Sequence, residues 1–281
     1  MIPEEVRQRY TMERQLAAQI RSALPSEREA AVASAYAAYF RRFPFVRAED
    51  HLDMGTTPGK LAFLRCLLRD STRILEIGCG YGGTLRALAG EREGCVGLDV
   101  AGALISKARE QGKVAFVAGS AVRFDAGEAS FDAAFSIDLV EHLHPDDLPA
   151  HLASVRRALR PGGCYTVMTP HRATGPHDVS RYFERAAAGL HLREYSYAEL
   201  GRLAKAAGFR GLSAPLLPLR LAVLAPALVR RSLAPVGWKV PLERAGPALP
   251  AGRVRTAVFK AAALQTVCLV MYKPRPEDRL P

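Results

Sequence analysis

Between residues 60 and 207, runs with the apolar spacing of helices alternate with short, continuous apolar runs. The short runs predict buried strands at Arg73–Ile77, Cys95–Val100, Val114–Ala118, Phe131–Ile137 and Gly163–Met168. The helical runs lie at Lys60–Arg69, Thr84–Ala89, Ala103–Gln111, Leu148–Leu159 and Tyr197–Ala207. A last strand-like run follows at Thr266–Tyr272. This alternation predicts an α/β fold with a parallel sheet that is covered by helices on both faces.

Two regions fall outside this alternation. Residues 1–59 predict helices, including an alanine-rich run from Glu27 to Phe40. Residues 215–265 hold seven of the nineteen prolines and the only tryptophan, Trp238, and they separate the last strand from the others. We therefore expect four parts, namely an N-terminal helical cap (1–59), a core (60–214), a helical insertion (215–265) and the final strand with its tail (266–281).

The composition is that of a globular protein, with 49% hydrophobic and 24% charged residues among 281, and it excludes collagen-like, coiled-coil and wholly disordered chains. The net charge of +11 is concentrated in residues 215–265, where eight Lys and Arg residues face only Glu243, leaving +4 for the rest of the chain. This basic, apolar segment is too interrupted by proline to predict a membrane span. It is expected either to pack as a helical hairpin on its own domain, or to act with the N-terminal helices as a lid that forms an acceptor channel, or to touch a membrane surface.

The cysteines favour a reducing cytoplasm as the location of the protein. None of the five forms a C-x-x-C pair: Cys66, Cys79, Cys95, Cys164 and Cys268. A zinc cluster or a disulfide scaffold is therefore not expected. The acidic N-terminus lacks an apolar run, so no signal peptide is expected.

The most informative motif is Gly78-x-Gly80-x-Gly82, which joins a predicted strand to a predicted helix. Glycines let the backbone turn tightly and approach a ligand, and a helix N-terminus offers unpaired N–H groups. Gly83 also completes the G-x-G-x-x-G spacing of a dinucleotide site, so the glycines alone fit two classes of nucleotide ligand.

Two acidic residues beside this loop distinguish between the classes. Glu76 lies two residues before the first glycine and suits a cationic or hydroxyl-rich ligand better than a pyrophosphate. Asp99 ends the next predicted strand, where a carboxylate can accept both hydrogen bonds of a ribose diol. Together they favour a ribose-containing ligand over a purely structural turn.

With these residues in place, the chain resembles the class I S-adenosylmethionine-dependent methyltransferases over about residues 60–214 and the final strand. Glu76-x-Gly78-x-Gly80-x-Gly82 is similar to the first family motif, Phe131–His142 to the fourth-strand motif, and Leu159–Gly163 to the turn before strand five. The resemblance implies a doubly wound, seven-stranded, mostly parallel sheet with an antiparallel last strand, a Rossmann-like fold. It also implies S-adenosyl-L-methionine bound across the ends of strands one to four.

The resemblance carries an expected cofactor site as well. Its residues are Glu76, Gly78, Cys79, Gly80, Gly82, Asp99, Val100, Ser120, Ala121, Val122 and Ile137. The family often places an acid after the third strand to hold the adenine amino group, and here Ser120 stands in its place. Backbone groups around Ala121 and packing against Val122 are therefore expected to hold the adenine.

Five of the seven histidines follow the predicted fourth and fifth strands or precede the last helix: His142, His144, His171, His177 and His191. Because ligands of an open α/β sheet lie beyond the carboxyl ends of its strands, we expect these side chains at one rim. A hydroxyl acceptor needs a base, and histidine titrates in the right range. His177 is the first candidate, before His142 and His171, although each can instead simply cap a turn.

Atoms that could bind a metal ion are present on Glu141, His142, His171 and His177, but the spacing of these residues matches no fixed metal-site motif. No metal ion is therefore expected. The leading hypothesis is methylation of a small molecule, preferably at oxygen, with a natural product, quinone-like ring, lipid or sugar as acceptor. The basic insertion keeps an RNA or protein methyltransferase as an alternative. Nucleic acid is disfavoured because no Asn/Asp-Pro-Pro-Tyr/Phe motif or RNA-binding module is present. A non-catalytic partner subunit and a dehydrogenase are further alternatives.

Overall fold

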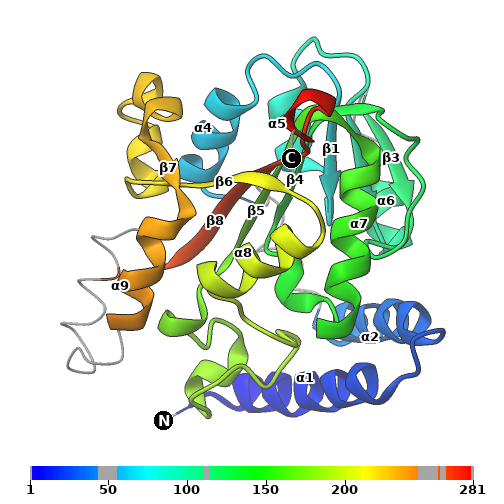
Figure 1. Ribbon diagram of the computed structural model, residues 1–281. Coiled ribbons are helices and arrows are strands. Elements are labelled where there is room, and N and C mark those ends of the chain that lie inside the picture. The colour runs from blue at the N-terminus through cyan, green and yellow to red at the C-terminus, as the bar shows by residue number, and fades with distance from the viewer. Residues whose placement is uncertain (1, 44–55, 110–113, 246–258, 260–263, 280–281) are drawn as a thin grey trace.

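The computed structural model describes residues 2–43, 56–109, 114–245, 259 and 264–279 (Figure 1). The helices are α1 (Glu4–Ser22), α2 (Arg28–Arg42), α4 (Pro58–Leu67), α5 (Gly83–Ala89), α6 (Gly102–Arg109), α7 (Leu148–Ala158), α8 (Tyr197–Ala206) and α9 (Lys239–Ala245). The strands are β1 (Ile74–Ile77), β2 (Val96–Asp99), β3 (Ala115–Ala118), β4 (Phe131–Ile137), β5 (Leu159–Pro170), β6 (Arg210–Pro215), β7 (Leu233–Pro235) and β8 (Thr266–Tyr272). Short 3-10 turns include η1 (Val140–His142), η2 (Pro145–Asp147), η3 (Arg172–Thr174), η4 (Val179–Tyr182), η5 (Leu219–Ala222), η6 (Pro226–Leu228), η7 (Arg230–Ser232), η8 (Val236–Trp238) and η10 (Pro276–Arg279).

The described strands form one eight-stranded sheet in the order β3-β2-β1-β4-β5-β8-β6-β7. Strands β1 to β5 pair in parallel, and β8 runs antiparallel between β5 and β6. The doubly wound, mostly parallel sheet with an antiparallel last strand is thus confirmed. The eighth strand is β7, a three-residue edge strand beside β6. Strand β7 was not predicted because it lies in the proline-rich insertion.

Helices cover both faces of this sheet, as the alternation of elements predicts. Helices α4, α5 and α6 pack on one face through residues such as Leu64 and Leu85. Helices α7 and α8 pack on the other through residues such as Leu152 and Leu200. Successive residues of β8 alternate between the two cores, because side chains of a strand point to opposite faces in turn.

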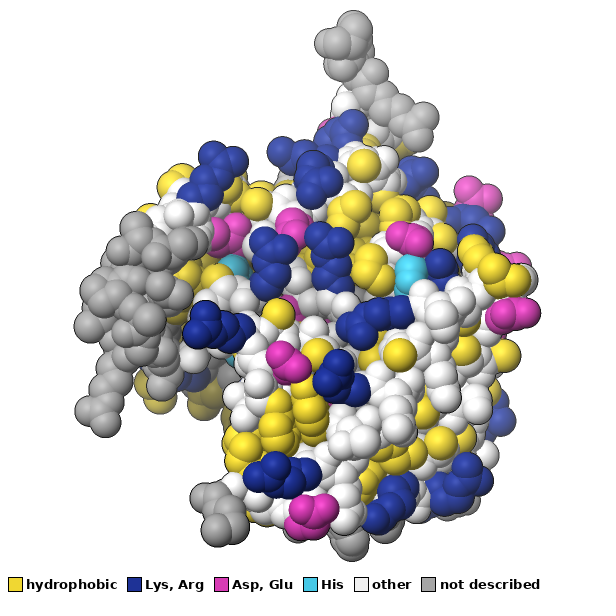
Figure 2. Space-filling view, turned by 90° about the horizontal axis from the view of Figure 1, so that it is seen from below, with side chains coloured by type: hydrophobic (Ala, Val, Ile, Leu, Met, Phe, Trp, Pro, Cys, Tyr) yellow, Lys and Arg dark blue, Asp and Glu magenta, His cyan; other side chains and the backbone are white. Residues whose placement is uncertain are grey.

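The N-terminal helices α1 and α2 lie at the end of the sheet where the parallel strands finish (Figure 1). They form a separate small core in which Leu16 and Tyr39 pack with Leu190 from the loop before α8. Their outer surface carries exposed arginines: Arg7, Arg14, Arg21, Arg41 and Arg42. Figure 2 views the molecule from this side, where Lys and Arg side chains are spread among apolar ones. Within the region predicted as a helical cap, residues 2–43 thus hold two helices.

The insertion forms short turns, strand β7 and α9 within residues 215–245, and not a long helix. It packs against α4, where a Cβ on Gly59 would lie 2.7 Å from Arg220 Cα. The remainder of the predicted insertion, at 246–258 and 260–263, lies outside the described residues, as do residues 44–55 of the predicted cap. No helix in the described ranges is both long and apolar enough to cross a membrane.

A buried chain of hydrogen bonds joins the sheet to α7 and to the loop after β3. The Ser136 and Tyr165 hydroxyls lie 2.7 Å apart, and the Tyr165 hydroxyl lies 2.8 Å from His151 Nε2. His151 Nδ1 donates to the Ala121 carbonyl at 2.6 Å, since a carbonyl oxygen can only accept. His151 Nε2 therefore accepts from Tyr165, and the chain of bonds holds residues 120–122 at a fixed position beside the sheet.

This geometry generates a prediction about stability and pH. Burial lowers the pKa of His151 to about 4, so the folded protein binds fewer protons than the unfolded chain between that pH and the ordinary histidine pKa of about 6.5. The free energy of unfolding should therefore fall as the pH is lowered through this window. In His151→Gln, the amide can make the same hydrogen bonds but does not titrate. The slope of the unfolding free energy against pH should therefore be smaller in this variant, by the contribution of about one proton. Urea denaturation across the window measures both slopes, and equal slopes would contradict the assignment.

Candidate functional site

The turn from β1 into α5 is built on glycines in the left-handed region of backbone space. Gly78, Gly80 and Gly82 have φ values of +76°, +51° and +73°. A Cβ on Gly82 would lie 2.2 Å from the Phe116 ring, so this position packs against the protein. A Cβ on Gly80 would meet nothing within 4 Å, so the backbone there faces open space. Such an exposed backbone segment can approach a ligand closely.

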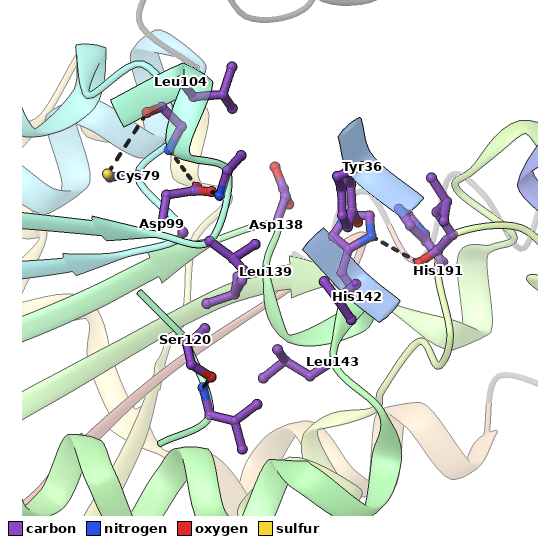
Figure 3. A pocket seen from close by; sticks show the side chains of 18 of the residues that line it. Tyr36, Cys79, Asp99, Leu104, Ser120, Asp138, Leu139, His142, Leu143 and His191 are labelled. Carbon is purple, nitrogen blue, oxygen red and sulfur yellow. Dashed lines mark hydrogen bonds between the residues drawn. The ribbon is translucent and has the colours of Figure 1, made fainter. Parts of the chain in front are cut away.

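The carboxylate of Asp99 ties this turn to the end of β2. Asp99 Oδ2 accepts from the Gly80 N–H at 2.9 Å, and Oδ1 accepts from the Ala101 N–H at 2.8 Å (Figure 3). A carboxylate oxygen has more than one acceptor site, so Asp99 can accept further hydrogen bonds from a ligand. Its position at the carboxyl end of β2 is the one expected for a carboxylate that recognises a ribose diol.

Glu76 is a buried acid with an unsatisfied oxygen. Its exposed fraction is 3%, and its Oε2 has no hydrogen-bond partner among the described residues. Burial raises the pKa of this carboxyl well above its usual range. A buried carboxylate oxygen without a partner is costly, so the site fits a ligand that brings a cationic or hydrogen-bond-donating group to it.

One cavity of about 680 Å³ connects the turn with the loops after β3 and β4 and with α1 and α2 (Figure 3). Ten of the eleven expected cofactor residues line it: Glu76, Gly78, Cys79, Gly80, Asp99, Val100, Ser120, Ala121, Val122 and Ile137. The exception is Gly82, which shapes the turn behind the cavity wall. Apart from that glycine, the residues expected to bind the cofactor thus line one space.

Ser120 caps the loop after β3. Its hydroxyl oxygen accepts from the Val122 N–H at 3.1 Å, and the side chain is buried. The carbonyl of Ala121 is occupied by His151, and the carbonyl of Val122 accepts from the Ser154 hydroxyl at 3.0 Å. The loop therefore presents a rigid surface to the cavity, with Ser120 as part of the turn.

The far wall of the cavity comes from the N-terminal helices. Apolar side chains of α2 line it, among them Val32, Tyr36 and Phe40, together with Arg9 and Glu13 of α1. No residue of the insertion within 215–245 lines the cavity. Of the two segments expected to form a lid, the structure therefore places the N-terminal helices over the cavity.

His142 and His177 line the cavity, and His171 does not. His142 Nδ1 donates to the Leu190 carbonyl at 3.0 Å, and burial lowers the pKa of this imidazole to about 3. The backbone N–H of His177 donates to Glu194 Oε1 at 2.7 Å. Nε2 of the His177 ring lies 2.9 Å from the Thr174 hydroxyl, and burial lowers the pKa of the ring.

His171 is fully buried between β5 and α9. Its Nε2 lies 2.6 Å from Glu243 Oε1, and its Nδ1 accepts from the Ala173 N–H at 3.0 Å. Both ring nitrogens are therefore used within the protein, away from the cavity.

The loop before α8 supplies a histidine–carboxylate pair to which the sequence argument gave no role. His191 lines the cavity, and its Nδ1 lies 2.9 Å from Glu194 Oε1. Burial lowers the pKa of His191, but the hydrogen bond that the ring donates to Glu194 and the negative charge of nearby Glu141 outweigh it and raise the pKa to about 9. The spacing His191-x-x-Glu194 was the one signal in the sequence that pointed to this pair.

Comparison with known proteins agrees with this geometry. Residues 74–163 match the family model described as a methyltransferase domain. A Mycolicibacterium smegmatis protein described as a probable S-adenosylmethionine-dependent methyltransferase is 32% identical over 52% of this chain and 53% of its own. The 24-methylenesterol C-methyltransferase 2 of Arabidopsis thaliana is 28% identical over 60% of this chain and 50% of its own. The chain thus spans about half the length of the curated relatives it matches.

Solved structures share the fold over most of the chain. The Burkholderia thailandensis 1,6-didemethyltoxoflavin-N1-methyltransferase has a TM-score of 0.54 at 23% identity and covers 90% of this chain and 91% of its own. An S-adenosylmethionine-dependent methyltransferase from Archaeoglobus fulgidus has a TM-score of 0.56 at 16% identity, over 82% and 100%. At these identities the likeness concerns the fold alone. Residues 74–163 therefore match a methyltransferase domain, and the chain shares the fold of S-adenosylmethionine-dependent methyltransferases.

Proposed function

We propose that this protein binds S-adenosyl-L-methionine and transfers its methyl group to a small-molecule acceptor, preferably to a hydroxyl group. One observation carries the proposal. A single cavity holds the glycine turn and Asp99 at one end and the His142, His177 and His191 side chains at the other. Donor and acceptor can therefore meet in one space, as an in-line displacement requires.

The residues present fit this cofactor. Asp99 has acceptor capacity for the ribose hydroxyls, and the unpartnered Oε2 of Glu76 suits a group that donates hydrogen bonds, such as an ammonium. Gly80 leaves room for close approach, while Ala121 and Val122 offer a rigid surface for the adenine ring. When bound, the cofactor supplies a methyl group on a positively charged sulfur, which is a good leaving group.

The chain's own residues would align the acceptor and accept its proton. Tyr36, Phe40 and Leu143 make the acceptor wall largely apolar. His177 stays our first candidate for the base, because its Nε2 faces the oxygens of Thr174 and His171 and its Nδ1 is then free of a proton. His142 is second, since burial makes it a weaker base.

The acceptor class follows from the cavity and not from the relatives. O-methyltransferases of Pyrenophora dematioidea and Penicillium expansum are among the similar proteins, beside the sterol C-methyltransferase. His142 and His177, whose lowered pKa values leave the rings neutral, favour a hydroxyl acceptor, which must lose a proton, over a carbon acceptor. The absence of disulfides among the five cysteines supports a reducing compartment such as the cytoplasm.

Substitution of Asp99 should weaken cofactor binding selectively. Loss of a charge-assisted hydrogen bond costs about 1.5–3 kcal/mol, so Asp99→Ala should reduce affinity for S-adenosyl-L-methionine by roughly tenfold or more. Ser120→Ala, which removes only a turn-capping hydroxyl, should reduce it less. Calorimetric titration of both variants measures the order, and equal losses would contradict the assigned roles.

Substitution of His177 should slow turnover without weakening cofactor binding. If His177 is the base for a hydroxyl acceptor, His177→Ala should lower turnover by about 10²–10⁴-fold. His171→Gln is the comparison, because His171 lies away from the cavity and its loss should lower the melting temperature more than turnover. Transfer of radiolabelled methyl groups to a panel of hydroxylated acceptors measures both, and unchanged turnover in His177→Ala would remove it from the mechanism.

We further propose that the insertion touches anionic membrane surfaces. Exposed apolar side chains lie on it beside exposed arginines: Leu216, Leu217, Val223, Leu224, Leu228, Arg220, Arg230 and Arg231. Such a surface combines apolar contact with attraction to anionic lipid. The protein should sediment with anionic vesicles more than with neutral ones, and Leu224→Asp, at 80% exposure, should reduce this binding without altering the fold. No sedimentation with anionic vesicles would end the proposal.

A further inference from the structure

Three side chains with metal-binding atoms converge beside the cavity. Glu141 and His142 lie on η1, directly after β4, and His191 lies in the loop before α8. One donor atom from each lies within 4.8 Å of the others. The two segments are fastened together, because the Arg193 N–H donates to the Glu141 carbonyl at 3.1 Å. In the sequence, Glu141 and His142 were considered together with His171 and His177 as metal-binding candidates. In the fold, Glu141 and His142 lie beside His191 instead.

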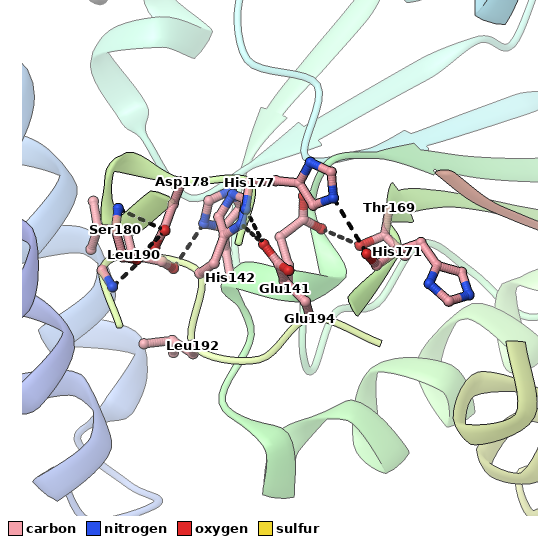
Figure 4. Close-up of polar contacts among 12 residues, drawn as sticks. Glu141, His142, Thr169, His171, His177, Asp178, Ser180, Leu190, Leu192 and Glu194 are labelled. Atoms are coloured by element: carbon pink, nitrogen blue, oxygen red, sulfur yellow. Dashed lines mark hydrogen bonds and ion pairs between the residues drawn. The ribbon is translucent and has the colours of Figure 1, made fainter. Parts of the chain in front are cut away.

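The carboxylate of Glu141 is incompletely satisfied. Its side chain is fully buried, and Oε2 accepts from the Thr169 hydroxyl at 2.8 Å (Figure 4). Oε1 has no hydrogen-bond partner among the described residues. Because a buried carboxylate oxygen without a hydrogen bond is costly, this oxygen is suited to accept a cation or a hydrogen-bond donor in addition to Thr169.

Both imidazoles are held in the way that metal-binding histidines are held. His142 Nδ1 donates to the Leu190 carbonyl at 3.0 Å, and His191 Nδ1 lies 2.9 Å from Glu194 Oε1. With the Nδ1 proton directed at an oxygen, Nε2 of each ring is the nitrogen left to bind a metal. In His191, which the nearby carboxylates keep protonated, the metal takes the place of the Nε2 proton. Metal-ligating histidines usually make this outer hydrogen bond to a carbonyl or carboxylate, which fixes the ring.

We propose that Glu141, His142 and His191 bind one divalent first-row transition-metal cation. Two imidazole nitrogens and one carboxylate oxygen form a donor set that suits Zn²⁺ and its neighbours and leaves coordination positions open. Since His142 and His191 line the cavity, those positions face the space assigned to the acceptor. There the cation would bind an acceptor hydroxyl and ease its ionisation, a role that rests on the proposed function, whereas the binding itself does not.

The full chain, treated with EDTA and transferred to metal-free buffer, should be titrated with Co²⁺ while its visible absorption is recorded. Co²⁺ replaces Zn²⁺ in such sites and reports its ligands by colour. One equivalent of Co²⁺ should bind with new visible bands, and one equivalent of Zn²⁺ should displace it. Because no cofactor or acceptor is added, failure here would leave the methyl-transfer proposal untouched.

Variants test which residues hold the ion. Glu141→Gln, His142→Asn and His191→Asn should each lower Co²⁺ affinity by at least about 10-fold, and Glu194→Gln, acting through His191, by about 10–100-fold. His144→Asn is the matched control, because His144 also lines the cavity but caps η2, a position that asparagine also favours. Melting temperatures identify any variant that fails to fold. No stoichiometric binding by the EDTA-treated wild type, or equal losses in His144→Asn, would overturn the proposal.

Discussion

The hydrogen bond from the Gly80 N–H to the Asp99 carboxylate is the contact on which the site depends. It joins the turn after β1 to the end of β2, so that two loops from neighbouring strands form one wall. The turn can form because residue 82 is a glycine, which adopts a left-handed backbone and leaves room for the Phe116 ring. The Gly80–Asp99 hydrogen bond and the packing of Gly82 therefore determine how a ligand is positioned at this end of the cavity.

The other end of the cavity is defined by long-range packing. Helices α1 and α2 bury their apolar faces against the loop that carries Leu190, and the Leu190 carbonyl in turn fixes the ring of His142. The same loop supplies His191 and Glu194. The N-terminal cap therefore does more than enclose the cavity, because it also orders the segment that faces the acceptor.

Local sequence signals predicted the sheet, the glycine turn and Asp99, since each depends on residues close together in the chain. Strand β6 was not predicted, because its six residues include Gly211 and end at Pro215. The contact of His171 with Glu243 and the approach of Glu141 to His191 could not be read from the sequence, since each pair lies far apart along the chain. Spacing places a histidine on a loop, but only the packed fold determines whether it faces a cavity or a buried carboxylate.

The central claim is that one cavity binds an adenosyl donor beside an acceptor site. Calorimetric titration of the wild-type protein with S-adenosyl-L-methionine, S-adenosylhomocysteine and NADH tests it most directly. The account predicts micromolar binding of both adenosyl compounds and no binding of NADH. Binding of NADH alone would show that the Gly78–Gly83 turn holds a dinucleotide, and binding of none of the three would contradict a cofactor site in this cavity.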